Sequence, residues 1–156
     1  MGGDNYVQTG GGNDHICLGG GNDEVDSGDG DDFVDAGDGK NKVKTGNGND
    51  TVRTGTGDDE IDTGNGVDGV VDLGGKNKIF TGNEADTVTA GSGDDEIETG
   101  DGDDVVAAGD GKNKVVTGNG DDRITTGAGD DEIDGGNGFD ICSPGAGTNK
   151  VKDCEG

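Results

Sequence analysis

The sequence is poor in the residues from which most globular cores are built. It has no tryptophan, one tyrosine, one methionine, three phenylalanines and one proline, and apolar residues make up only 24% of its 156 positions. Composition alone would suggest a disordered chain. The longest apolar run, Val105 to Ala108, is far too short for a membrane span, so we expect no membrane insertion.

Positive charge is scarce as well. Eleven Lys and Arg stand against 36 Asp and Glu, which gives a net charge of -25. Such a chain repels the phosphates of nucleic acids and of anionic membrane surfaces, so neither is expected as a partner. The only histidine, His15, has no evident nucleophile beside it, and the many Asp-Asp pairs include no unique one. We therefore expect no enzyme.

What the chain does have is an unbroken repeat of nine residues. Counted from Met1, seventeen blocks end at Asp153; position 3 is Gly in sixteen of them, position 5 is Asp or Asn in all, and position 7 is Val or Ile in sixteen. This regularity is typical of a solenoid. We predict one domain over residues 1–153, with residues 154–156 as a C-terminal cap.

Each block is predicted to form a Gly-rich turn at positions 1 to 5 and a short strand at positions 6 to 9. Because side chains alternate along a strand, positions 7 and 9 share the inner face. Two blocks make one coil of eighteen residues, so odd and even blocks form two parallel sheets, back to back. The prediction is an all-β solenoid of about eight and a half coils.

The stretch Thr54-Gly55-Thr56-Gly57-Asp58-Asp59-Glu60-Ile61-Asp62 resembles the RTX, or hemolysin-type, calcium-binding nonapeptide G-G-x-G-x-D-x-U-x. Here the first motif glycine is usually Thr, Ala or Ser. The resemblance implies a right-handed parallel β-roll. It also implies Ca²⁺ ions between the turns of successive coils, held by the motif aspartate and by backbone carbonyls.

The even-numbered turns carry the clearest candidate metal ligands. Position 5 is aspartate in every even block, giving Asp14, Asp32, Asp50, Asp68, Asp86, Asp104, Asp122 and Asp140. Stacked ~4.8 Å apart, neighbouring carboxylates would repel by about 3–4 kcal/mol, and Ca²⁺ is the hard cation that oxygen ligands suit. Eight turns leave seven gaps, so we expect up to seven ions. Position 4 supplies further candidates at Asn13, Asp31, Asn49, Asp103 and Asp121.

The odd-numbered turns alternate asparagine and aspartate at position 5. Their aspartates, Asp23, Asp59, Asp95 and Asp131, form a second set of candidate metal ligands. Three of the intervening turns carry a lysine at position 4: Lys40, Lys76 and Lys112. One interpretation places each ammonium group in the cation slot, with calcium along the even edge only. The alternative is that the lysines face solvent and calcium binds at both edges.

The outward faces of the two sheets differ. The odd strands carry a ladder of alternating sign at position 6, from Glu24 and Lys42 to Glu132 and Lys150. Such cross-strand pairs favour one register. The even strands are less charged, so an adhesive or ice-binding role of this face is the alternative function. End-to-end or lateral self-association would use the same open surfaces.

The three cysteines lie near the two ends of the repeat. Cys142 and Cys154 are candidates for a disulfide that closes the roll, with two unbonded, packed thiols as the alternative; Cys17, seven coils away, is too distant to pair with either. The chain end resembles those of some secreted RTX-like proteins, which implies an extracellular, oxidising location. The predicted function is a secreted structural, stabilising or secretion-linked module whose folding is coupled to Ca²⁺.

Overall fold

The computed structural model describes residues 2–155, and Met1 and Gly156 lie outside the described residues. Seventeen strands follow one another with turns between them. The odd-numbered strands are β1 (Tyr6–Gly11), β3 (Glu24–Asp29), β5 (Lys42–Asn47), β7 (Glu60–Asn65), β9 (Lys78–Phe80), β11 (Glu96–Asp101), β13 (Lys114–Asn119), β15 (Glu132–Asp134) and β17 (Lys150–Lys152). The even-numbered strands are β2 (His15–Cys17), β4 (Phe33–Gly37), β6 (Thr51–Thr54), β8 (Gly69–Val71), β10 (Thr87–Thr89), β12 (Val105–Ala107), β14 (Arg123–Thr125) and β16 (Ile141–Ser143).

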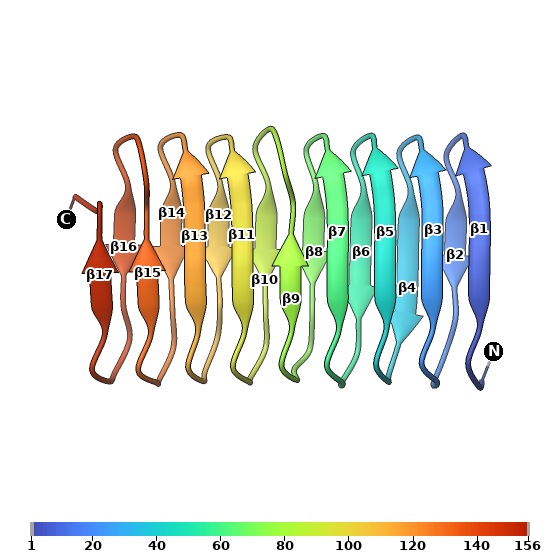
Figure 1. Cartoon of the computed structure of the whole chain (residues 1–156), viewed down its shortest axis with the longest axis horizontal. Coiled ribbons are helices and arrows are strands. Elements are labelled where there is room, and N and C mark those ends of the chain that lie inside the picture. Colours follow the sequence, from blue (N-terminus) through green and yellow to red (C-terminus); the bar gives the residue numbers. More distant parts are fainter. Residues whose placement is uncertain (1, 156) are drawn as a thin grey trace.

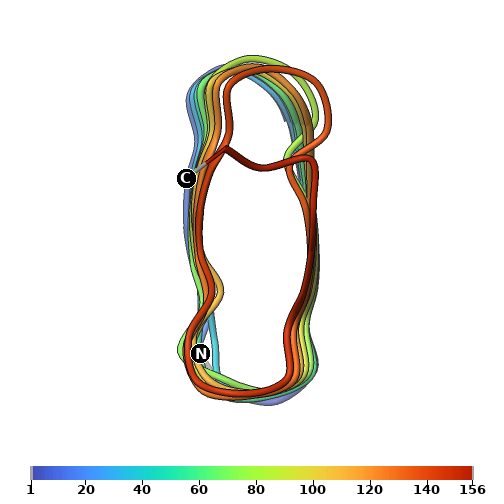
Figure 2. The ribbon, with the colours of Figure 1, turned by 90° about the vertical axis from the view of Figure 1, so that its left-hand side faces the viewer.

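The strands form two parallel sheets, one of nine odd strands and one of eight even strands. Each strand pairs with the strand one coil away. Partners are eighteen residues apart, as in Val25 opposite Val43, except where the register shifts at Gly37 opposite Thr54. The chain rises through an odd strand, crosses over the even-numbered turn and descends through an even strand, in a right-handed coil (Figure 1). Viewed along its axis, the molecule is a flattened ring with the sheets as its long sides (Figure 2). The predicted parallel β-roll is confirmed.

A single file of small aliphatic side chains fills the space between the sheets. Position 7 is at most 6% exposed from Ile16 to Cys142, while Val151 in the last strand is 45% exposed. Position 9 completes the inner face mostly with Ser, Ala and Thr, and with Asp72 in one coil. The Thr hydroxyls donate along the axis, as from Thr45 to the Thr63 carbonyl at 3.2 Å. The described residues include no helix of the length and apolarity needed to cross a membrane.

The strands of the two sheets differ in length, which the repeat did not predict. Most odd strands continue through positions 1 and 2 of the next block, where Gly28 pairs with Gly10 and Asp29 with Gly11. Most even strands end at position 8. Pairing therefore extends into the even-numbered turns and makes them the more regular edge.

The glycine at position 3 is required by the stacking of the turns. Gly57 has φ of +147°, a conformation that L-residues rarely adopt. A Cβ atom at Gly57 would also collide with the carbonyl oxygen of Gly39, one coil earlier. The position-3 carbonyl thus lies directly against the next turn, with no side chain between them.

The C-terminal residues close the last coil. Cys142, in β16, and Cys154 form a disulfide with their Cα atoms 5.9 Å apart, and Cys17 is a free, exposed thiol. Glu155 continues the hydrogen bonding of the even turns, because its carboxylate accepts from the Asp140 N–H at 2.8 Å. The terminal segment crosses from one sheet toward the other at the end of the ring (Figure 2).

Candidate metal sites

The eight aspartates of the even edge form a continuous column. The backbone N–H of each of the first seven donates to Oδ1 of the aspartate one coil later, at 2.8 Å from Asp14 to Asp32 and at 2.9 Å from Asp122 to Asp140. From Asp32 onward, each of these residues is no more than 3% exposed. The sequence thus folds into a file of stacked carboxylates in the even-numbered turns, which connect the odd strands to the even strands at the top of Figure 1.

The second oxygen of every carboxylate in the column has no hydrogen-bond partner. Within the described residues, Oδ2 is buried and unpartnered in all eight even-edge aspartates and in the four odd-edge aspartates Asp23, Asp59, Asp95 and Asp131. A buried, unpaired acceptor costs about 1–3 kcal/mol, and more when it is charged. A cation beside these twelve buried oxygens would offset that cost.

The electrostatics of the column agree with this. Burial raises the pKa of Asp68 to about 6, against the Thr63 hydroxyl and the Asp50 N–H that lower it, and the charges of Asp50 and Glu84 raise it further. Burial likewise raises the pKa of Asp86 to about 6, and the charges of Asp68 and Asp104 add to the effect. Burial and neighbouring charges therefore disfavour the ionised forms of Asp68 and Asp86, which the raised pKa values express.

The odd edge shows what this buried oxygen would face. Asn41 occupies the same position as Asp59, and its Oδ1 accepts from the Asp23 N–H at 3.0 Å, just as an aspartate would. Its Nδ2 donates to the carbonyls of Gly37 at 3.0 Å and Gly39 at 3.2 Å, within its own turn. An aspartate at this position would present a carboxylate oxygen to the same carbonyls. Oxygen facing oxygen in a buried turn is the donor set of a hard cation.

The lysines at position 4 of the odd edge lie at the surface of the roll. Lys40, Lys76 and Lys112 are exposed, and none makes an ion pair within 4.0 Å among the described residues. Lys40 does line a shallow hollow of about 250 Å³ with Asp58 and Asp59. The asparagine amide occupies the position facing the carbonyls, because a short side chain at position 5 points into the turn whereas position 4 points outward.

Position 4 makes a second set of hydrogen bonds between turns. Here the side chain of one coil accepts from the backbone N–H of the next, as from Asn49 to Asp31 at 2.9 Å. The other position-4 candidates at this edge, Asn13, Asn49, Asp103 and Asp121, do the same and are exposed. Within residues 2–155, only Oδ1 of each side chain accepts from the backbone, and the second terminal atom of the side chain does not bond to it. These residues therefore lie beside the column rather than inside it.

Three even turns lack this polar side chain, with Val67, Ala85 and Phe139 in its place. In one of them, Glu84 replaces the position-3 glycine and has φ of +77°. Its carboxylate accepts from the Gly66 N–H at 2.9 Å. Glu84 therefore supplies a carboxylate close to the turn in which Ala85 supplies none.

The ladder on the outer face of the odd sheet has the predicted register. Glu60 stands opposite Lys42 and Lys78, and Lys42 Nζ lies 3.4 Å from the Glu60 carboxylate. Glu96 lies between Lys78 and Lys114, at 3.5 and 2.9 Å. These pairs are exposed, so each stabilises the roll by only about 0–1 kcal/mol, and they act mainly on register.

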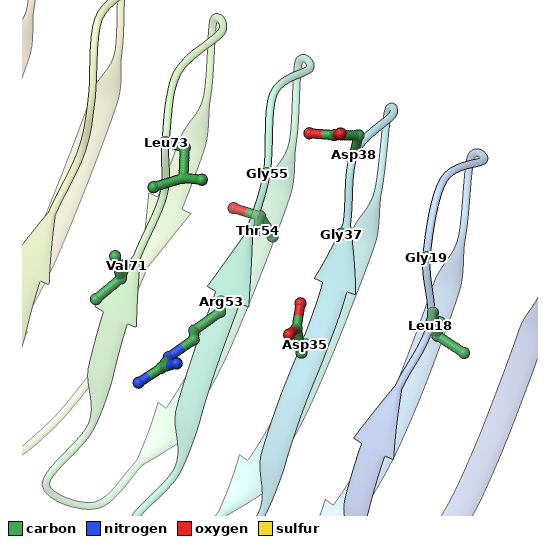
Figure 3. A pocket seen from close by; sticks show the side chains of 10 residues that line it. All are labelled: Leu18, Gly19, Asp35, Gly37, Asp38, Arg53, Thr54, Gly55, Val71 and Leu73. Carbon is green, nitrogen blue, oxygen red and sulfur yellow. The ribbon is translucent and has the colours of Figure 1, made fainter. Parts of the chain in front are cut away.

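The other notable feature of the surface is an open hollow of about 590 Å³ on the even sheet. Leu18 and Leu73 lie on its two outer coils, and Asp35 and Arg53 lie between them (Figure 3). Its ten lining residues include no histidine, cysteine, serine or lysine.

The residues present fit Ca²⁺. No group of three His, Cys, Asp or Glu side chains in the described part of the chain is arranged around a common metal position. Each turn instead offers one buried carboxylate oxygen together with backbone carbonyls, and a site rich in carbonyl oxygens is one that Ca²⁺ accepts, with its 6–8 oxygen ligands. The fold and its turns thus define a calcium-binding β-roll.

Comparison with known families agrees. The model of the family described as "RTX calcium-binding nonapeptide repeat (4 copies)" matches residues 1–34, 35–70, 73–106, 80–115 and 107–142. The matches span most of the sequence, and the chain belongs to the RTX calcium-binding nonapeptide repeat family, a family of structural calcium-binding domains. No curated protein and no solved structure matches the chain.

Proposed function

We propose that the even-edge turns hold up to seven Ca²⁺ ions between the aspartates from Asp14 to Asp140, and that the odd-edge turns of Asp23, Asp59, Asp95 and Asp131 hold further ions. The observation that carries this proposal is the buried, unpartnered Oδ2 of each of these aspartates. Oδ1 is already used by a backbone N–H, as in Asp32. Oδ2 is therefore the oxygen left for a cation.

Each ion would be held by one such Oδ2 and by carbonyls of the Gly-rich turns, of which the position-3 carbonyl lies against the next coil. The exposed side chains Asn13, Asp31, Asn49, Asp103 and Asp121 are supplementary ligands or hydrogen-bond acceptors beside these sites. Ions in the turns of Val67, Ala85 and Phe139 lack that support, so these sites are weaker. Glu84 offsets the loss in the Ala85 turn.

Folding of the roll is coupled to binding of the ions. Without them, the folded chain buries twelve carboxylate oxygens that have no partner, while the unfolded chain exposes them all to water. Because the unfolded chain has no preformed site, the free energy of ion binding stabilises the folded state directly.

A pair of opposite substitutions tests this assignment. Asp50→Asn places an amide where Asn41 has one, so it keeps the bond from the Asp32 N–H and supplies a donor for the carbonyls of the turn. We expect at least one bound ion fewer, counted by native mass spectrometry at saturating calcium. Asn41→Asp makes the reverse change, and we expect at least one ion more.

Asp62→Asn is the matched control, because it removes the same charge from an exposed side chain of β7. It should leave the ion count unchanged. An ion count that is identical in the wild type, Asp50→Asn and Asn41→Asp would refute the assignment of the sites.

The role of the module is that of a secreted structural or stabilising domain. The Cys142–Cys154 disulfide supports an oxidising compartment. Low cytoplasmic calcium would leave the chain unfolded, and extracellular calcium in the millimolar range would fold it. This requires the calcium midpoint of folding to lie between those two concentrations.

Binding through the even sheet is the second candidate function. Val71, Val105 and Ile141 are 38–44% exposed on this sheet, which favours an adhesive or self-associating face over a purely solvated one. The ice-binding alternative depends on outward threonines such as Thr51 and Thr87, and Gly69 interrupts their column. Sedimentation in calcium tests lateral association, and thermal hysteresis tests ice binding; a monomer without hysteresis would remove this candidate.

A further inference from the structure

Asp72 departs from the repeat in the middle of the roll. It follows β8 at position 9, where the preceding coil has Thr54 and the following coil has Ala90. It is 2% exposed, so its carboxylate lies inside the roll, whereas the only other acid at this position, Asp153, is exposed. The next residue, Leu73, stands where most blocks have glycine and is 65% exposed.

The Asp72 carboxylate changes the hydrogen bonding of the adjacent odd turn. Thr54 Oγ1 donates to its Oδ2 and Asn77 Nδ2 donates to its Oδ1, both at 2.7 Å. In Asn41 and Asn113, the same amide donates to carbonyls of its own turn. Asn77 is therefore drawn away from the carbonyls of Leu73 and Gly75, to which no side chain of the described residues donates.

Two further buried carboxylates flank the same asparagine. The Asp59 N–H donates to Asn77 Oδ1 at 2.9 Å, and the Asn77 N–H donates to Asp95 Oδ1 at 2.8 Å. Oδ2 of both aspartates is buried without a partner. Asn77 thus touches three acidic residues, and the nearby Lys76 is exposed and makes no ion pair within 4.0 Å in the described part of the chain.

Asp59 and Asp72 are linked through Asn77, whose Oδ1 accepts from the Asp59 N–H and whose Nδ2 donates to the Asp72 carboxylate. Burial raises the pKa of Asp59 to about 6, against the Asn41 N–H, and the Asp72 charge raises it further. The three acids do not surround one common position, so the pair provides the contact and Asp95 contributes charge from the following coil.

We propose that Asp59 and Asp72 form a divalent-cation site of a second type, in which two side-chain carboxylates, one from the turn and one from inside the roll, hold a single hard cation such as Ca²⁺. This inference rests on the proposed function of the turns, and it adds a ligand, Asp72, that lies outside the repeat pattern. Two carboxylates together with the Asp95 charge attract a cation more strongly than one carboxylate per turn. This site therefore fills first, and it does so at the centre of the roll, beside β7 and β9.

Two variants of Asp72 test the site. Asp72→Asn keeps the size of the side chain and removes its charge, and Asp72→Thr restores a residue that the same sheet accepts at Thr54 and Thr126. The probe is Ca²⁺ alone, added to the chelated protein and followed by native mass spectrometry and calorimetry. We expect both variants to lose one ion and the affinity of the first ion bound to weaken by about tenfold or more. Asp62→Asn should behave as the wild type.

The outcomes separate this inference from the proposed function. A wild type that binds no calcium overturns both. A wild type that binds calcium, with both Asp72 variants matching it in ion count and in the affinity of the first ion, overturns the Asp59–Asp72 site alone and indicates a proton shared between the two carboxyls. Far-UV circular dichroism at saturating calcium verifies that Asp72→Thr is folded, so that a lost ion reports the site.

Discussion

At the scale of single residues, the choice between aspartate and asparagine at position 5 decides what each turn needs. Both residues accept the backbone N–H of the previous coil, as Asp50 and Asn41 do. Asn41 then satisfies its own turn with an amide, whereas Asp50 leaves a buried oxygen without a partner. The odd edge therefore alternates two kinds of turn: those with an amide that donates to its own turn, as at Asn41 and Asn113, and those with a buried carboxylate oxygen that has no partner.

The glycines at position 3 give a second residue-scale prediction. Gly57→Ala would place a Cβ against the Gly39 carbonyl in a backbone with φ of +147°. We expect the free energy of unfolding to fall by roughly 2–3 kcal/mol, measured by urea denaturation at saturating calcium. Gly69→Ala is the control, because Gly69 lies in β8 with its nearest neighbour at 4.0 Å. Equal stability of the two variants would contradict this account of the turns.

The sequence predicted the residue types of the sites better than their contacts. The column from Asp14 to Asp140 follows from the period alone. For the odd turns, the sequence left two interpretations of Lys40, Lys76 and Lys112, and it did not predict that the Asn41 amide donates to the carbonyls of its own turn. Asp72 was missed, although the signal was present: it is the one acid at an inner position 9 before the last block. Glu155 as the end of the even ladder was missed as well, since it lies outside the repeat.

At the scale of elements, the nine-residue period predicted which positions face inward and which residues pair between strands, but it did not predict the length of the strands. Positions 7 and 9 face inward as predicted, and partners are eighteen residues apart except at the end of the β4–β6 pairing, where the register shifts and Gly37 pairs with Thr54. The longer odd strands arise from backbone pairing at positions 1 and 2, as between Gly46 and Gly64. Glycine-rich sequence predicts a turn at these positions, and only the stacking of neighbouring coils shows that the turn begins two residues later.

The charge ladder also belongs to this scale. Glu96 pairs with Lys78 and Lys114 across three strands, and the Lys114 ammonium hydrogen-bonded to Glu96 is the main cause that lowers the pKa of that carboxyl. A shift of pairing by one coil would place like charges opposite each other. The ladder therefore disfavours misregistered coils more than it stabilises the correct one.

At the scale of the whole molecule, folding brings many aspartates close together in the buried turns of the roll. The buried aspartates Asp59, Asp68, Asp86 and Asp95 have pKa values raised to about 6 from an ordinary 3.8, chiefly by burial. Because these pKa values are higher in the folded chain than in the unfolded chain, binding of protons to the aspartates stabilises the fold. That contribution is fully present below the unfolded pKa and is lost as pH rises through about 6.

The chelated protein should therefore be more folded at about pH 5 than at about pH 7.5. Far-UV circular dichroism of the chelated chain at the two pH values measures this. Adding salt at the higher pH is the control, since it screens exposed charges more than buried ones and should restore less structure. Loss of β-structure on acidification to about pH 5 would show that the buried carboxylates do not oppose folding.

The central claim is that the column of aspartates requires cations, and a calcium titration of the chelated protein at about pH 7.5, followed by far-UV circular dichroism, tests it most directly. We predict a largely unfolded spectrum without calcium and a cooperative gain of β-structure below about millimolar calcium. A chelated chain with the full β-spectrum, unchanged by added calcium, would contradict the account.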